Sequence, residues 1–251
     1  MDWHRRYLQQ AAWTRLLREY LLAKAGISRA HRVLEVGCGT GVILRAAAQR
    51  TDGPGLRGVA VHGLDVQAEP LLQARLHVPS AHLCRGDALA LPYADRSFDI
   101  SFSHFLLLWV KDPLRVLQEM RRVTRRRGHV LALAEPDYSA RLDHPRDLAS
   151  LGQWQERALM QQGANTTIGS QLAVLFQHCE MQIIETGTIA PWRPQALTDD
   201  EFAGEWDVLR EDLSGLVPET ELDRMMLLDA HARRQGDRIL HVPTYFVHAQ
   251  V

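Results

Sequence analysis

The chain has 251 residues, of which 46% are hydrophobic and 24% charged, a composition typical of one globular α/β domain with an insertion. Its formal net charge of −1 argues against nucleic-acid binding, which needs a broad basic surface. The 3 cysteines do not make a disulfide framework and are typical of a reducing compartment. No targeting signal is visible and no apolar run reaches the ~20 residues that span a bilayer, so we expect a cytoplasmic protein without a membrane span.

Apolar residues recur at three- and four-residue spacing over residues 3–25, which predicts one or two helices that end at Gly26. Strand and helix signals then alternate as far as residue 136. The expected strands are 33–36, 59–64, 81–84, 98–103 and 129–134, and the expected helices are 41–50, 67–76 and 113–123. This alternation predicts a doubly wound, mostly parallel sheet with helices on both faces.

The rhythm changes after Asp137. The expected helices are 146–162, 169–178, 199–213 and 219–234, and the expected strands are 182–190 and 241–250. Because helices and strands are interleaved, we expect a single domain with one core. Its parts would be an N-terminal helical cap over 1–30, a nucleotide-binding half over 31–136, and helical insertions with the final strands over 137–251 on the substrate side.

The most informative segment is V-L-E-V-G-C-G-T-G, residues 33–41. It reads as a short buried strand that carries Glu35 and then breaks into a turn with glycine at alternate positions. Glycine permits positive φ and lets a ligand lie against the backbone, and the following helix points free N–H groups at the turn. The dinucleotide fingerprint G-x-G-x-x-G needs a small residue at position 42, where this chain has Val42.

Two further carboxylates follow expected strands. Asp65 closes the second strand, and Asp87 follows the third in the segment C-R-G-D-A. Since ligands of doubly wound sheets bind outside the carboxyl ends of the strands, a carboxylate there can accept both ribose hydroxyls of a nucleoside. The segment L-P-Y-A-D-R-S-F-D-I, residues 91–100, then leads into the fourth strand.

This ordered set, over residues 33–136, resembles the class I S-adenosylmethionine (SAM) methyltransferases. Residues 91–100 are similar to a signature of the ubiquinone/menaquinone-biosynthesis type, also called methyltransferase domain 11. The resemblance implies a seven-stranded Rossmann-like sheet, SAM as cofactor and S-adenosylhomocysteine as product. One departure is R-R-R-G at 125–128, where members of the family often carry Pro-Gly-Gly.

The resemblance also implies a role for each matched position. The positions expected to bind the cofactor are Glu35, Gly37, Cys38, Gly39, Gly41, Asp65, Val66, Asp87, Ala88 and Ser103. Within this set Asp65 would hold the ribose, Val66 would pack on adenine, and Glu35 would engage the SAM ammonium group. Gln10 or Arg18, on the N-terminal helix, would contact the SAM carboxylate; the open alternative is a helix that only covers the sheet edge.

Methyl transfer from a sulfonium is an in-line displacement, which positioning alone accelerates, and a base is needed only when the acceptor must lose a proton. We therefore expect no catalytic triad. His104, after the fourth strand, is the candidate base or orienting group, and the alternative is a packed or solvated histidine. The candidates for contact with the acceptor are Trp109, Glu135, Tyr138 and Trp206, with Trp192 as a further pocket wall. The alternatives for these residues are turn and core positions.

The leading hypothesis is SAM-dependent methylation of a small-molecule acceptor at oxygen, nitrogen or carbon, by a monomer or homodimer without a bound metal. Three alternatives remain open: an RNA or protein methyltransferase, a SAM-binding protein without catalysis, and a nicotinamide oxidoreductase. Against the first stand the near-neutral charge and the segment S-H-F-L at 103–106, where an Asn/Asp-Pro-Pro-Tyr tetrapeptide would be expected.

Overall fold

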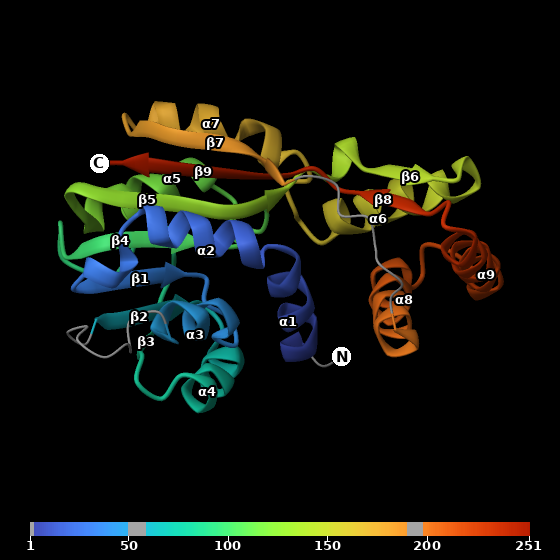
Figure 1. Ribbon diagram of the computed structural model, residues 1–251, viewed down its shortest axis with the longest axis horizontal. Coiled ribbons are helices and arrows are strands. Elements are labelled where there is room, and N and C mark those ends of the chain that lie inside the picture. Colours follow the sequence, from blue (N-terminus) through green and yellow to red (C-terminus); the bar gives the residue numbers. More distant parts are fainter. Residues whose placement is uncertain (1–2, 50–58, 190–197) are drawn as a thin grey trace.

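Seven strands form one sheet in the order β3-β2-β1-β4-β5-β9-β7, as Figure 1 shows. The computed structural model describes residues 3–49, 59–189 and 198–251 of the chain. The strands are β1 (Arg32–Val36), β2 (Ala60–Asp65), β3 (His82–Arg85), β4 (Phe98–Ser103), β5 (Thr124–Pro136), β7 (Gln182–Ile189) and β9 (Thr244–Gln250). Strand β9 runs opposite to the other six strands of this sheet, so the predicted doubly wound, mostly parallel architecture is confirmed.

The strand order reverses beside β1. Val36 at its end pairs with Leu64 of β2 on one side and with Ser103 of β4 on the other. Such a reversal leaves a crevice at the carboxyl ends of the strands, because the connections of β1 and β4 leave toward opposite faces of the sheet. The glycine turn and the segment after Ser103 therefore open on the same crevice.

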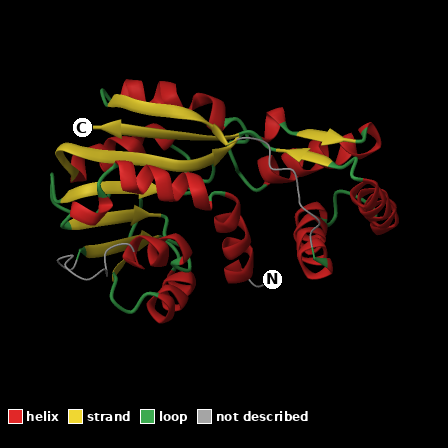
Figure 2. Cartoon of the chain, in the orientation of Figure 1, coloured by secondary structure: helices red, strands yellow, loops and turns green. Residues whose placement is uncertain are grey.

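Helices cover both faces of the sheet (Figure 2). Helices α5 (Pro113–Val123) and α7 (Ile168–His178) pack on one face, and α2 (Arg15–Lys24) and α3 (Val42–Gln49) pack on the other. The central strands are apolar on both sides because each face needs a buried surface, as with Val33 against α2 and Leu34 against α5. Helix α4 (Ala68–His77) lies beside α3 and covers β2 and β3.

The N-terminal segment forms two helices, α1 (Trp3–Trp13) and α2, which are separated at the buried residue Thr14. The chain after α2 turns at Gly26, whose φ of 78° confirms the predicted glycine at the helix end. Helix α1 stands away from the sheet faces and lies below the carboxyl ends of the strands (Figure 1).

The second half adds a small unit beyond those carboxyl ends (Figures 1 and 2). This unit, called the cap below, consists of β6 (Leu142–His144), β8 (Ile239–His241), α6 (Ala149–Gln161), α8 (Asp199–Leu213) and α9 (Glu219–Gln235). Strands β6 and β8 pair antiparallel, and the helices share a core around Trp206 and Met225. Two segments of the chain build the cap: β6 and α6 lie between β5 and α7, and α8, α9 and β8 lie between β7 and β9.

Several predicted boundaries differ from those observed. Strand β5 begins five residues earlier than expected, because Thr124 pairs with Phe98 before the register shifts, so the expected turn at 125–128 lies within the strand. The predicted helix 146–162 begins with a short 3₁₀ turn, and the predicted strand 241–250 divides into β8 and β9 at Pro243. The predicted ends at residues 50 and 190, and Trp192, lie outside the described residues.

Among the described residues, no helix combines the length and apolar character needed to cross a bilayer. The same part of the chain holds no group of three or more His, Cys, Asp or Glu side chains arranged to bind a metal ion.

Candidate active site

The glycine turn after β1 has a left-handed backbone at each of its three glycines. Gly37, Gly39 and Gly41 have φ values of 76°, 48° and 81°, a region that favours glycine. The amides of Gly37 and Cys38 both donate to the carbonyl of Leu64 at the end of β2, at 2.8 and 2.9 Å. The turn is thus fixed to the neighbouring strand by its own backbone.

Asp65 links this turn to the end of β2. Its Oδ2 accepts a hydrogen bond from the Gly39 amide at 2.8 Å, and its Oδ1 accepts one from the Gln67 amide at 2.9 Å. The carboxylate is half-buried at the rim of the sheet, so it faces the crevice and not the core. A carboxylate in this place fits the ribose hydroxyls of a nucleoside.

Two buried polar atoms near the ends of β1 and β4 support the same fit. The Glu35 Oε2 and Ser103 Oγ atoms are buried and accept no hydrogen bond from the described residues. Burial raises the pKa of Glu35 well above its usual value, and the charge of Arg18 opposes this effect. Since buried polar groups are normally satisfied, these atoms fit a polar ligand such as the methionyl part of SAM.

The other predicted cofactor positions lie around the crevice at different depths. Cys38 and Ala88 are buried, whereas Val66 is 59% exposed. The Asp87 side chain is exposed and its Oδ1 accepts a hydrogen bond from the Leu89 amide. The adenine contacts expected of Val66 and Asp87 thus fall at the open edge of the crevice and stay predictions.

Helix α1 lies directly on the glycine turn. The Tyr7 ring is 3.2 Å from the position that a Cβ on Gly39 would take, and the His4 ring bonds the Thr40 hydroxyl at 2.9 Å. Burial, with the charge of Asp65 in second place, raises the pKa of Tyr7. The side of α1 that carries Tyr7 therefore covers the cofactor crevice.

The two predicted polar residues of the N-terminal helices occupy different places. Gln10 lines a cavity described below. Arg18 is buried, and its Nη1 donates to the Ala11 carbonyl and the Thr14 hydroxyl at 2.8 and 3.0 Å. Arg18 is thus held against α1 and acts on the crevice through its charge near Glu35.

His104 joins the end of β4 to the N-terminal helices. Its Nε2 lies 2.8 Å from the Thr14 hydroxyl, and burial with the charge of Arg18 lowers its pKa to about 3. The ring is therefore neutral and weakly basic, and it does not line the cavity. These observations favour the packed-histidine interpretation over a general base.

Glu135, expected to contact the acceptor, instead shapes the turn after β4. Its carboxylate accepts hydrogen bonds from the amides of Leu106, Leu107 and Leu108 at 3.0, 3.0 and 3.3 Å. Burial raises its pKa to about 7, and the three amides oppose that rise. The turn that it holds presents Phe105 to the cavity, in a left-handed conformation with φ 52°.

A cavity of about 170 Å³ lies between the rim of the sheet and the cap. Helix α1 contributes Arg6, Gln10 and Trp13 to its wall, Thr14 follows them, and the rim contributes Phe105 and Tyr138. The cap supplies both apolar side chains, such as Leu151 and Leu209, and charged ones. Gln10 lies three residues after Tyr7 and is its neighbour on the helix surface, so the cavity lies beside the face of α1 that carries Tyr7.

Of the residues predicted to contact the acceptor, Tyr138 lines this cavity, whereas Trp109 and Trp206 do not. Trp109 is 47% exposed and lies elsewhere on the surface. Trp206 is a core residue of the cap, 2% exposed, and its indole N–H donates to Asp229 at 2.9 Å. Asp229 is itself part of the wall, so Trp206 contributes to the cavity indirectly, by orienting the Asp229 side chain.

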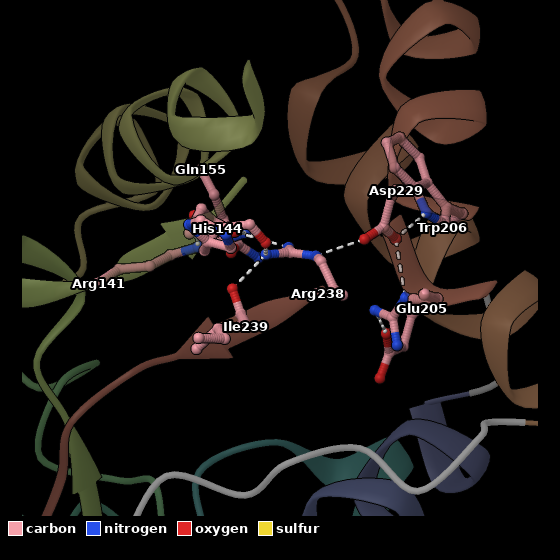
Figure 3. A network of polar contacts seen from close by, with 10 residues as sticks. Arg141, His144, Gln155, Glu205, Trp206, Asp229, Arg238 and Ile239 are labelled. Carbon is pink, nitrogen blue, oxygen red and sulfur yellow. Dashed lines mark hydrogen bonds and ion pairs between the residues drawn. The ribbon is translucent and has the colours of Figure 1, made fainter. Parts of the chain in front are cut away.

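The charged part of the wall is a continuous network, shown in Figure 3. Arg141 and Arg238 share Asp143, and Arg238 also bonds Asp229. Asp229 pairs in turn with Arg233, which reaches Glu205 at 2.9 Å. Sequence analysis missed this set, although the i, i+4 spacing of Asp229 and Arg233 on an expected helix was a visible signal.

Residues 34–132 match the family model of the methyltransferase domain. This segment is similar to methyltransferase domains. The malonyl-[acyl-carrier protein] O-methyltransferase of Halorhodospira halophila is 34% identical over 131 residues, which cover 50% of this chain and 43% of that protein. The ubiquinone/menaquinone biosynthesis C-methyltransferase UbiE of Bdellovibrio bacteriovorus is 38% identical over 125 residues, covering 48% and 49%. The chain thus matches about half the length of these curated relatives, and the matched part contains the glycine turn and Asp65.

The whole fold has solved counterparts. Geranyl diphosphate methyltransferase in complex with SAM superposes with a TM-score of 0.58 at 17% sequence identity, over 93% of this chain and 83% of that one. This likeness establishes the Rossmann-like fold and includes the region outside the methyltransferase domain.

Proposed function

We propose that this chain transfers the methyl group of SAM to a small molecule held between the sheet and the cap. The observation that carries the proposal is the position of α1, which places Tyr7 on the glycine turn and Gln10 in the wall of the cavity. Cofactor and acceptor would then meet at the end of β4. The methyltransferase domain matched by residues 34–132 supports the same activity.

SAM supplies an activated methyl group whose leaving group is already a sulfonium. The residues of the chain need only bind, align and exclude water, since positioning provides much of the rate gain. Asp65 and the glycine turn would hold the cofactor, and Phe105 with Tyr138 would fix the acceptor against it. With neutral His104 bonded to Thr14 and Glu135 bonded to backbone amides, an acceptor that ionises readily or has a free lone pair fits best.

A small acceptor is favoured over RNA or a protein surface by the cavity, which the cap closes on one side. The named relatives methylate oxygen in one case and carbon in the other, so they leave the acceptor atom open. They also do not single out the ubiquinone-biosynthesis type, which stays a proposal for this chain. A SAM-binding protein without catalysis is the second candidate, because the crevice residues alone do not distinguish it.

The test begins with calorimetric titration of SAM and S-adenosylhomocysteine. We expect Asp65→Ala to weaken SAM binding at least about tenfold, because the variant lacks the carboxylate that would accept hydrogen bonds from the ribose. Glu211→Ala, which removes an exposed carboxylate on α8, is the matched control and should bind like the wild type. Equal affinity in the Asp65 variant would contradict the assignment.

Transfer itself is tested with methyl-labelled SAM and a panel of phenols, amines, acids and quinones. Label in a small-molecule product supports the enzyme. Persistent SAM binding with no transfer to any acceptor supports the non-catalytic candidate.

A further inference from the structure

The charges of the cavity wall do not balance, and the excess lies on α1. Within the cap network, three guanidinium groups are matched by three carboxylates. Arg6 also lines the cavity but forms no ion pair with a described carboxylate. Its guanidinium group donates a weak hydrogen bond to the Gln9 side chain at 3.3 Å and lies over the Trp13 ring at 5.4 Å. One positive charge therefore faces the cavity without a direct counter-ion.

Arg233 adds unused hydrogen-bond donors at the same place. Its Nε donates to Asp229 and its Nη2 to Glu205, which leaves Nη1 with two N–H groups and no described acceptor. Arg233 is held by these two bonds and by the Phe202 ring, 5.5 Å from its guanidinium carbon. Arg6, Arg233 and Glu205, to which Arg233 is bonded, all line the cavity. A fixed donor and a surplus positive charge thus face the same cavity.

The rest of the wall contains apolar side chains beside polar ones such as Gln10, Gln155 and His241. Leu151, Val208, Leu209 and Leu240 come from the cap, and Phe105 comes from the rim. A ligand that fits must present an apolar body to these residues and anionic oxygen atoms to the guanidinium groups. A monoanion matches one surplus positive charge, whereas a phosphate monoester carries about −1.5 to −2 charges at neutral pH.

We propose that the acceptor is a carboxylic acid with an apolar body, whose carboxylate binds to Arg6 and to Nη1 of Arg233. This inference rests on the proposed function and adds the substrate class. Because Arg233 belongs to the cap and Phe105 to the rim, we place the carboxylate on the cap side of the cavity. The acid group is therefore recognised, and the methyl group goes to another atom of the acceptor.

The test uses matched pairs of acid and amide: phenylacetate, 3-phenylpropanoate and hexanoate, each against its uncharged primary amide. Binding is followed by calorimetry in the presence of S-adenosylhomocysteine and again without it. We expect at least one acid to bind about tenfold more tightly than its amide, since hydrogen bonds to charged groups are the stronger ones. Arg6→Gln should remove this preference, whereas Arg15→Gln, an exposed arginine of α2, should keep it.

Arg233 is substituted together with its partner Glu205, because the Glu205 carboxylate left alone in a buried position could unfold the protein. The double variant Arg233→Gln/Glu205→Gln should lose most of the preference for the acid while retaining SAM affinity and a folded circular dichroism spectrum. If that variant does not fold, the comparison of Arg6→Gln with Arg15→Gln decides alone.

Equal binding of acid and amide in every pair, no measurable binding of any acid, or an unchanged preference in Arg6→Gln would each overturn the inference. A base-labile methyl ester as the transfer product would overturn the orientation, since the carboxylate would then be the methylated group. The two proposals fail separately. If SAM binds but no acid is preferred over its amide, this inference is wrong and the proposed function is not affected. Failure of SAM to bind sinks the proposed function.

Discussion

Gly39 combines a φ of 48° with a position directly under the Tyr7 ring, 3.2 Å from the Cβ that another residue would add. Gly39→Val should therefore strain the turn, displace α1 and weaken SAM binding at least about tenfold in calorimetry. Gly204→Val, at a glycine of α8 with open space around it, is the control and should bind normally. A Gly39 variant with full affinity would show that the turn does not shape the crevice.

His104 couples folding to pH. The unfolded chain takes up a proton on histidine near pH 6.5, whereas the folded ring stays neutral down to about pH 3. Between these values the unfolded state binds more protons, so the free energy of unfolding falls as the pH is lowered. Glutamine does not titrate, so His104→Gln abolishes this pH-dependent loss of stability. The variant also lacks the bond between the His104 ring and Thr14.

We expect the stability margin of the wild type over His104→Gln to narrow by about 1–2 kcal/mol from pH 7 to pH 5 in urea unfolding. His231→Gln, on the exposed face of α9, should show no such narrowing. A margin that is constant or grows toward pH 5 would mean that His104 is protonated in the folded protein.

The turn after β4 depends on another strand, β5. Glu135 accepts three consecutive amides of that turn, and no other described side chain replaces it there. Glu135→Gln keeps the shape but turns one acceptor into a donor against those amides. The expected loss is about 1–3 kcal/mol in the free energy of unfolding, the cost of leaving buried groups unsatisfied.

The same substitution should lower the affinity of the cavity for the acid probes, because Phe105 loses its fixed position. Urea unfolding and calorimetry measure the two effects, with Glu211→Gln as the exposed control. Normal stability in Glu135→Gln would show that the turn after β4 keeps its conformation without the Glu135 carboxylate.

Sequence periodicity located the elements that pack against the sheet. Helix α5 begins at Pro113 and ends at Val123, as predicted, because Asp112 caps it and its apolar stripe is strong. Strand β5 was longer than expected, since its early residues read as a turn and join the sheet only through pairing with Phe98. Strands β6 and β8 have three residues each, too few for alternation to reveal.

One part of the candidate site could also be predicted from the sequence, and another part could not. The crevice was predictable because its residues follow strand ends, which topology brings to one rim. The cavity wall was not, because Arg141, Glu205, Asp229 and Arg238 come from separate elements and meet only in the folded cap. Glu135 was placed at the correct edge, but its role depends on the backbone of a distant turn.

At the scale of the whole molecule, the two halves share one sheet. Strand β9 lies between β5 and β7, so the last residues of the chain complete the sheet that the first half begins. The cap is inserted between these strands and is tied by the buried network, in which Arg238 is 7% exposed. The expected single-domain organisation therefore predicts that cap and sheet unfold together.

Two probes test this expectation. Fluorescence, to which the buried Trp206 of the cap contributes, and far-ultraviolet circular dichroism, which reports the whole chain, should give coincident urea transitions. Arg238→Gln leaves Asp143 and Asp229 without their shared cation, and removing one partner of a buried pair costs about 3–5 kcal/mol. Both transitions should shift together by that amount, whereas Arg224→Gln, an exposed arginine of α9, should shift neither. If fluorescence alone moved to lower urea, the cap would be a separately folding unit, because its network would then stabilise the cap without stabilising the sheet.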